Sequence, residues 1–384
     1  MTSSKWKQRT VFLTGATGFV GSELMRRLLD AGVKQLFALV RGADDAARQE
    51  KLDRTLLRMY GKDEDRARKA GQRLVLVPGD ITRPALGIPD RDRARLLERV
   101  DHVMHCAANV SFGATLEEHL VQNLWGTRYA LNLAEEIHAA SGLRKFDLVG
   151  TAFIAGTRQG LIREDELDLG QGFYNSYEES KFQAELEVFR RRVDFPVTRF
   201  RPSIVVGDQK TGRTSSFKML YWLVKVYQQG LWRMVPARRD AVVDLVPVDV
   251  VADSILAISP QEFSHSRAVH IAAGPRHCCQ AEELAQLVRR FFNGPRIFFF
   301  SPDFYQTFIG PPSRLLARGK LKHVLTRGRV YEPYFINRKI FDAANFERGT
   351  AGTSIEVPDV TDYFSRLLQF CIDSEWGKKD LGAS

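Results

Sequence analysis

Tyr177 and Lys181 stand four residues apart in the stretch Tyr-Glu-Glu-Ser-Lys and could carry proton-transfer chemistry. We predict a helix here that runs to about Arg192, so the two side chains share one face. An ammonium group at that range favours the phenolate and lowers the pKa of a tyrosine from about 10 toward the working range of a general acid. A chain with ten tyrosines also shows such a pair by chance, so the neighbouring motifs decide its meaning.

The hydroxyl of Thr151 ends a strand that we predict over residues 146–149, shortly before this pair. There it could hydrogen-bond a carbonyl oxygen that is being reduced. The alternative is a threonine that only ends a β-strand. We therefore expect Thr151, Tyr177 and Lys181 to be catalytic if a cofactor site precedes them in the fold.

A glycine-rich turn, TGATGFVG over residues 14–21, lies between a predicted strand and a predicted helix. Gly15 permits a tight turn, Gly18 lets backbone approach an anion, and Gly21 lets the helix close on the sheet. The helix N-terminus then offers unpaired N–H groups to a diphosphate. A plain structural turn is the alternative. We predict dinucleotide binding, with contacts from Gly15, Thr17, Gly18, Phe19, Val20 and Gly21.

A second predicted strand, over residues 35–40, ends at Arg41. An acidic residue at this place would bind the ribose 2′-hydroxyl of NAD, whereas an arginine accommodates the 2′-phosphate of NADP. The sequence therefore favours NADP(H), although Asp44 and Asp45 follow closely.

Two further strand ends offer cofactor contacts. Asp80 follows a predicted strand over residues 73–77, where its carboxylate could accept from an adenine amino group or cap a turn. Ala107 and Ala108 follow a predicted strand over residues 101–106, and small residues there leave room for a ligand in the crevice.

The predicted strands are apolar without alternation and are separated by helical stretches, which is typical of a parallel sheet covered on both faces. We predict an α/β fold, a Rossmann-type doubly wound parallel sheet with a smaller, mostly helical C-terminal substrate-binding cap. The NADP-binding domain is expected to comprise residues 1–207 plus 241–275, and the cap residues 208–240 and 276–384.

The stretch over residues 217–227 is apolar nearly all round, so its helix is expected to be buried, to line an apolar cavity or to touch lipid. The tail from about residue 302 to 384 is expected to be irregular. Trp222, Trp232 and the cluster at Phe298 are candidates for contact with a membrane surface.

The net charge of +10 is unevenly spread, with two runs of Lys and Arg at residues 209–239 and 310–331. This asymmetry indicates an acidic partner, such as an anionic cofactor, a CoA-like substrate, an acidic carrier protein or a membrane. A solvated basic face is the alternative. No motif points to nucleic acid.

The four cysteines form no Cys-x-x-Cys pair and no Cys/His cluster, so we expect neither a metal site nor a disulfide framework. No apolar run is long enough for a secretory signal or for a membrane span of about 20 residues. We expect a cytoplasmic protein with peripheral membrane contact left open, and the oligomeric state is also left open.

Taken together, these motifs resemble the extended short-chain dehydrogenase/reductase superfamily, and within it the thioester reductase and fatty acyl-CoA reductase branch, also called the male-sterility-type NAD-binding family. The resemblance covers residues 10–275. Its most specific parts are GDITRPALGI from Gly79 and HVMHCAANVSF from His102, followed by Asn123-Leu-Trp-Gly-Thr and the tyrosine-lysine pair. On this resemblance Ile81, Asn123, Tyr177 and Lys181 join the expected cofactor contacts. One departure is Gly150, which precedes Thr151 where the family usually has a serine.

The resemblance implies NADPH-dependent reduction of an acyl thioester, carried by CoA or an acyl carrier protein, to an aldehyde and then to an alcohol. Tyr177 would protonate the carbonyl oxygen and Lys181 would bind the nicotinamide ribose. Two alternatives remain open. One is other chemistry of the superfamily, in a sterol or ketone dehydrogenase or a nucleotide-sugar epimerase. The other is a non-catalytic NADP-binding sensor or membrane-associated scaffold.

Overall fold

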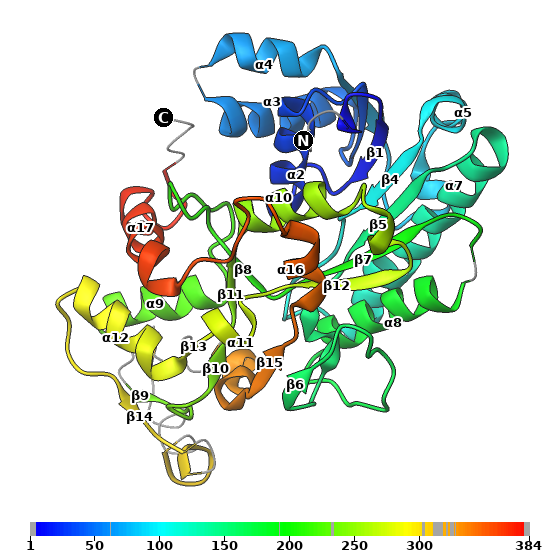
Figure 1. Ribbon diagram of the computed structural model, residues 1–384. Helices are drawn as coiled ribbons and strands as arrows, with labels where there is room; N and C mark the ends of the chain where they lie inside the picture. The colour runs from blue at the N-terminus through cyan, green and yellow to red at the C-terminus, as the bar shows by residue number, and fades with distance from the viewer. Residues whose placement is uncertain are drawn as a thin grey trace.

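The computed structural model describes residues 5–379 apart from 62, 192, 232–233, 302–303, 310–317, 320–321, 323–325 and 327. Its centre is a seven-stranded sheet in which every neighbouring pair is parallel (Figure 1). The order across it is β3-β2-β1-β4-β5-β7-β12. The strands span Thr10–Thr14 (β1), Gln35–Val40 (β2), Leu74–Pro78 (β3), His102–His105 (β4), Lys145–Val149 (β5), Val197–Pro202 (β7) and Arg267–Ile271 (β12). The predicted Rossmann-type α/β fold is confirmed.

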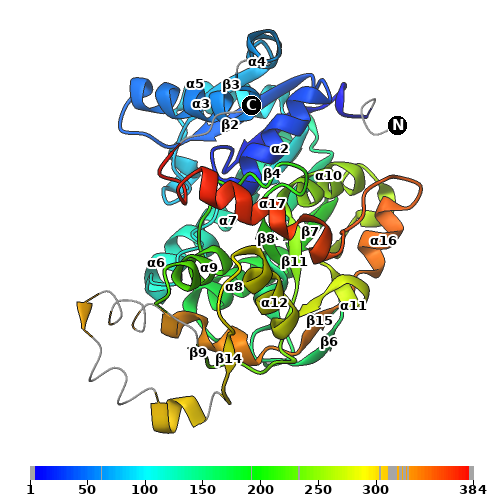
Figure 2. The ribbon, with the colours of Figure 1, turned by 90° about the vertical axis from the view of Figure 1, so that its left-hand side faces the viewer.

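Helices cover both faces of the sheet and bury one apolar side each (Figure 2). On one face, α2 (Phe19–Asp30) packs against α10 (Val248–Ile258). On the other face lie α5 (Asp90–Arg99), α7 (Gly126–Ser141) and α8 (Ser176–Arg190). Because both faces are dry, strands such as β1 read as continuous apolar runs.

The chain reverses direction across the sheet between β1 and β4. From β1 it proceeds outward to β2 and β3, and it then returns to the other side of β1 for β4 and β5. The ends of β1 and β4 are joined by a hydrogen bond of 2.8 Å between Thr14 Oγ1 and His105 Nδ1. Ligands of open α/β sheets bind outside the carboxyl ends at such a switch point.

Several connections are helical. The charged stretch after β2 forms two helices, α3 (Asp45–Tyr60) and α4 (Glu64–Gly71). After β4, the short α6 (Leu116–His119) passes through a π-helical turn, η2 (Leu120–Trp125), directly into α7.

A second, smaller core joins three helices beside the sheet: α9 (Leu220–Gln228), α12 (Ala281–Phe291) and α17 (Val360–Asp373). Short strand pairs surround it. They are β8 (Ile204–Val206) with β11 (Leu245–Pro247), β9 (Met234–Val235) with β14 (Phe298–Phe299), β10 (Val242–Val243) with β13 (Cys279–Gln280), and β6 (Gly160–Ile162) with β15 (Lys339–Phe341). The four-residue α11 (Gly274–His277) precedes β13.

The expectation of an irregular tail is wrong for its second half, which contains α16 (Ala344–Thr350) and α17. The buried residues of α17 recur with helical spacing, so a signal was present in the sequence. They are Val360, Tyr363, Phe364, Leu367, Leu368 and Cys371. α16 packs against α10 and β12 instead of the cap core.

Among the described residues, no helix combines the length and the apolar character that crossing a membrane requires.

Candidate active site

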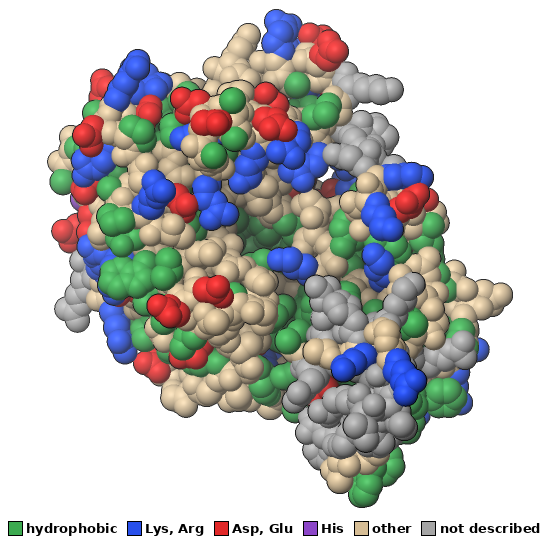
Figure 3. All heavy atoms as spheres, turned by 180° about the vertical axis from the view of Figure 1, so that it is seen from behind, with side chains coloured by type: hydrophobic (Ala, Val, Ile, Leu, Met, Phe, Trp, Pro, Cys, Tyr) green, Lys and Arg blue, Asp and Glu red, His purple; other side chains and the backbone are tan. Residues whose placement is uncertain are grey.

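A cavity of about 470 Å³ lies at the carboxyl edge of the sheet. Residues that follow β1, β2, β3, β4, β5 and β7 line it, and residues 216–221 close it from the cap side. From behind, the surface shows a hollow between the upper and lower parts of the molecule, with hydrophobic side chains inside it and Lys and Arg side chains at its rim (Figure 3). The hollow suits a ligand that is both anionic and apolar.

The glycine turn forms the wall next to α2. Gly15 has φ +74°, a left-handed conformation that favours glycine, and a Cβ there would lie 2.7 Å from the backbone nitrogen of Ala107. A Cβ on Gly21 would lie 2.0 Å from the carbonyl oxygen of Gly15. Gly18 is the N-cap of α2 and offers no side chain to its first N–H groups. The turn therefore fits a cofactor diphosphate, which would accept from these groups.

Positive charge gathers at the end of β2. Arg41 has 64% of its side chain exposed and lies 4.0 Å from Asp80, and Lys51 lines the same part of the cavity. Burial, with repulsion from Arg41, lowers the pKa of Lys51. Asp80 Oδ1 accepts from the backbone N–H and the hydroxyl of Thr82, so Asp80 caps a turn. Its contact with adenine stays a prediction.

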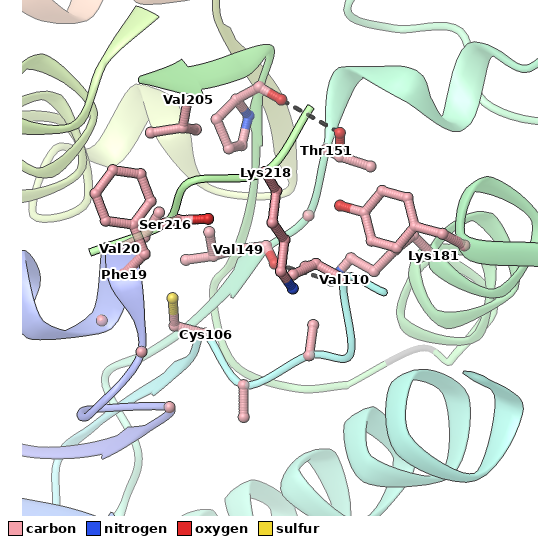
Figure 4. A pocket seen from close by; sticks show the side chains of 18 of the residues that line it. Phe19, Val20, Cys106, Val110, Val149, Thr151, Lys181, Val205, Ser216 and Lys218 are labelled. Atoms are coloured by element: carbon pink, nitrogen blue, oxygen red, sulfur yellow. Dashed lines mark hydrogen bonds between the residues drawn. The ribbon is translucent and has the colours of Figure 1, made fainter. Parts of the chain in front are cut away.

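Thr151, Tyr177 and Lys181 line this cavity together, although they come from β5 and α8. Thr151 and Lys181 lie across the cavity from Phe19 and Val20 at the start of α2 (Figure 4). The Thr151 hydroxyl donates weakly to the Pro202 carbonyl oxygen, at 3.4 Å. Lys181 Nζ donates to the Val149 carbonyl oxygen, at 3.0 Å.

The pKa of Tyr177 differs from the expectation. Burial raises it to about 12, while a hydrogen-bonding interaction with Thr151 opposes the rise. Lys181 does not lower it because its ammonium points to the Val149 carbonyl, and burial lowers the pKa of Lys181 itself to about 8. The phenol is therefore neutral near pH 7, the form that can donate a proton to a carbonyl oxygen.

Most of the other predicted cofactor contacts line the cavity, namely Gly15, Thr17, Gly18, Phe19, Val20, Gly21, Arg41, Asp80, Ile81, Ala107 and Ala108. Asn123 is not among the lining residues that the structure describes. Its amide accepts from the Asn109 N–H at 2.7 Å and donates to the Ser180 hydroxyl at 2.9 Å. Asn123 thus ties the loop after β4 to α8 from behind the cavity wall.

Sequence reasoning did not single out Lys51, Lys218 or Tyr334 as site residues, yet all three line the cavity. Lys218 was noted only as part of a basic run, and in Figure 4 it enters the cavity from the segment that precedes α9. No described residue forms a hydrogen bond or an ion pair with its ammonium. Tyr334 could not be found from a local pattern because it lies more than 150 residues after Tyr177.

Cys106 also lines the cavity, at the end of β4. Burial raises the pKa of its thiol to about 12. It is therefore protonated near pH 7 and is not an activated nucleophile. No group of three or more His, Cys, Asp or Glu side chains suited to a metal ion occurs in the described part of the chain.

The two basic runs are partly neutralised by partners that are distant in sequence. Arg238 pairs with Asp240 at 2.9 Å, and Arg239 pairs with Glu282 at 2.8 Å. Several other members of the predicted basic and aromatic sets, Trp232, Arg233, Arg314, Lys320 and Arg327, lie outside the described residues.

The helical stretch 217–227 is α9 in the structure, and its buried side chains are Leu220, Tyr221, Val224, Val226 and Tyr227. Part of α9 lines a second, apolar cavity next to the first. Of the three alternatives for this helix, burial and an apolar cavity both apply.

Comparison with known proteins gives a consistent relationship. Residues 13–255 match the NAD-binding family described as male sterility protein. The nonribosomal peptide synthetase FrzA of Cladobotryum sp is 30% identical over 94% of this chain and 36% of its own length. The fatty acyl-CoA reductase wat of Drosophila melanogaster is 28% identical over 66% of this chain and 54% of its own length. The chain thus spans about a third to a half of these relatives.

Among solved structures, the terminal R domain of the myxalamid PKS-NRPS biosynthetic pathway is similar, with a TM-score of 0.81 and 25% identity. The alignment covers 97% of this chain and 92% of that domain. The similarity therefore extends through the cap as well as the sheet.

Proposed function

This chain belongs to the male sterility protein family, a branch of the extended short-chain dehydrogenase/reductase type of oxidoreductase, and on that premise we propose that it reduces an acyl thioester with NADPH. The product is an aldehyde, and a second reduction gives an alcohol. The observation that carries this proposal is that Thr151, Tyr177 and Lys181 line one cavity with the glycine turn.

The cofactor is proposed to lie along the carboxyl edge, with its diphosphate on the turn at Gly15 and Gly18. Arg41 and Lys51 would receive a 2′-phosphate, which favours NADPH over NADH. When bound, NADPH supplies a hydride to the carbonyl carbon of the thioester.

The residues of the chain handle the carbonyl oxygen. Thr151 and the neutral phenol of Tyr177 donate hydrogen bonds to it and favour the negative charge that develops there. Tyr177 then gives its proton to this oxygen, while Lys181, held by the Val149 carbonyl, binds the nicotinamide ribose. Collapse of the resulting hemithioacetal breaks the C–S bond and releases the thiol and the aldehyde.

The carrier of the acyl group is proposed to be CoA or an acyl carrier protein. Both present a phosphate on a pantetheine arm, and Lys218 offers an unpaired cation at the cap side of the cavity. The names of the two relatives, a nonribosomal peptide synthetase and a fatty acyl-CoA reductase, are compatible with either carrier.

We also propose that residues 208–240 and 276–384 act as the substrate-binding cap and residues 1–207 plus 241–275 as the cofactor domain. The separate core of α9, α12 and α17 supports this division. The packing of α16 on α10 and β12 indicates that the tail also braces the cofactor domain.

The apolar second cavity disfavours a nucleotide-sugar epimerase, whose substrate needs polar partners. A sterol or ketone dehydrogenase and a non-catalytic sensor are distinguished by experiment. Incubation with NADPH and a panel of acyl-CoA and acyl-pantetheine thioesters, followed by mass spectrometry of the products, should show aldehyde or alcohol.

The variant Tyr177→Phe should lower this activity by about 10²- to 10⁴-fold without weakening NADPH binding. Tyr174→Phe is the matched control, because its hydroxyl contacts only the exposed amide of Gln159 among the described residues and the variant should keep full activity. Undiminished turnover in Tyr177→Phe would remove the assigned acid. NADPH binding with no turnover of any thioester, aldehyde or ketone would favour the sensor.

Peripheral contact with a membrane is a separate proposal, supported by exposed aromatic rings near β14. Phe298, Phe304 and Phe308 have exposed fractions of 51%, 47% and 64%. Co-sedimentation with anionic vesicles should be reduced when the three are replaced by serine, and absence of any binding by the unaltered protein would contradict it.

A further inference from the structure

A second cavity, of about 150 Å³, lies inside the cap between α9 and α12. Its lining is mainly aliphatic and aromatic. The polar groups at its wall already have partners: the Tyr227 hydroxyl donates to the Pro295 carbonyl, the Asn337 amide donates to the Val242 carbonyl, and the Tyr334 hydroxyl donates to Glu178. The cavity therefore suits an apolar occupant that needs no hydrogen bonds.

The second cavity adjoins the first. Five residues line both of them, namely Phe153, Ile204, Met219, Leu220 and Tyr334. Phe153 follows Thr151 by two residues, and its N–H donates to the Thr151 hydroxyl at 3.3 Å. A group attached to a carbonyl at Thr151 would thus reach the second cavity directly past this shared wall.

Tyr334 is a firmly held part of that wall. Its hydroxyl donates to Glu178 Oε1 at 2.7 Å and accepts from the Asn175 amide at 2.8 Å. Glu178 is fully buried and belongs to the same helical turn as Tyr177. The Tyr334 ring also packs edge-on against Phe153, at 5.5 Å between centroids. A wall fixed at both its ring and its hydroxyl does not yield easily to a longer ligand.

We propose that the second cavity receives the end of the acyl group and limits its size. This inference rests on the proposed thioester reduction and narrows its substrate class. An apolar cavity of 150 Å³ holds a group of about six carbon atoms, the size of benzene. The substrate is accordingly a thioester whose acyl group ends in a medium-length alkyl, branched alkyl or aryl group, and not a long fatty acyl chain.

The cavity can be filled from α12. Ala285 lines it and is only half-buried, so Ala285→Phe places a ring inside the cavity without replacing a core residue. Ala285→Leu is the milder form. The matched control is Ala140→Phe, which makes the same change at an exposed position of α7.

Binding and turnover are measured separately. Calorimetry with straight-chain alcohols from butanol to hexadecanol should show affinity that rises about fourfold per added methylene and then levels off once the cavity is full. Ala285→Phe should weaken octanol binding at least tenfold, Ala285→Leu less, and Ala140→Phe not at all. Affinity that rises unbroken to hexadecanol, or no binding of any alcohol, would overturn the size limit.

In turnover, hexanoyl, octanoyl and phenylacetyl thioesters should exceed palmitoyl thioester at least tenfold in kcat/KM. A preference for palmitoyl thioester would refute the inference and leave the thioester reduction intact. If no thioester is reduced, the proposed function fails, while the alcohol series still decides whether the cavity binds and limits an apolar chain.

Discussion

The wall of the active-site cavity that faces the glycine turn comes from consecutive strand ends, whereas the wall that faces the cap joins Phe112, Phe153 and Tyr334 from distant parts of the chain. In the first wall the backbone itself makes the surface, because Gly15, Gly18 and Gly21 have no side chains. In the second wall the surface is made of packed rings, with Phe112 edge-on to both Tyr177 and Tyr334 at 5.8 Å.

This difference has a functional consequence. A backbone surface tolerates almost no added atom, so it suits a ligand that never varies, such as a diphosphate. A surface of side chains can change shape by substitution and leave the fold intact. The cofactor wall should therefore be sensitive to the smallest change, and the cap wall should tune specificity.

The largest effect is expected for Gly21→Ala. The new Cβ would lie 2.0 Å from the Gly15 carbonyl, so the turn must shift and NADPH affinity should fall at least about 100-fold, as two lost charge-assisted hydrogen bonds would cause. Isothermal titration measures it. Gly71→Ala is the control, because nothing lies within 4 Å of its added Cβ. Unchanged affinity in Gly21→Ala would mean that the diphosphate does not rest on this turn.

The next effect concerns pH. Lys181 has a pKa lowered to about 8, so its ammonium is lost as pH rises through that value, and kcat/KM should fall by about tenfold per unit above it. Tyr177, with a pKa of about 12, stays protonated in this range. A pH profile from 6 to 10 tests both. Activity that instead rises with pH would indicate that a phenolate is the working form.

A smaller effect is expected at the ribose end of the cofactor wall. Arg41→Ala should weaken NADPH binding about tenfold, since one charge-assisted hydrogen bond is lost, and should leave NADH binding unchanged. Fluorescence titration with both cofactors gives the ratio. Arg54→Ala, a change on α3 at a residue that does not line the cavity, should alter neither. Equal losses for the two cofactors would contradict 2′-phosphate binding by Arg41.

The smallest effect is expected in the cap wall, for Tyr334→Phe. The change removes a donor from the buried Glu178, so the free energy of unfolding should fall by about 1–3 kcal/mol. The ring stays, so NADPH affinity should be unchanged and kcat should drop only a few-fold. Thermal unfolding and steady-state kinetics check this. A loss of NADPH affinity equal to that of Gly21→Ala would show that the two walls are not independent.

Local patterns were enough to predict the parts of the site that depend on neighbours in the chain. The glycine turn, the start of α2 and the face shared by Tyr177 and Lys181 follow from residue spacing, and the strands of the central sheet follow from apolar runs. The helical spacing in α17 was equally readable, although the aromatic and basic residues before it obscured it.

Only the tertiary structure decided the rest. The pKa of Tyr177 rises instead of falling because the fold buries the phenol and turns Lys181 toward the Val149 carbonyl, and desolvation is a property of packing. The bond from Tyr334 to Glu178 joins residues 156 positions apart, so no local pattern could indicate it. The apolar cavity exists only where α9 and α12 meet, because a cavity belongs to the space between elements and to no single one of them.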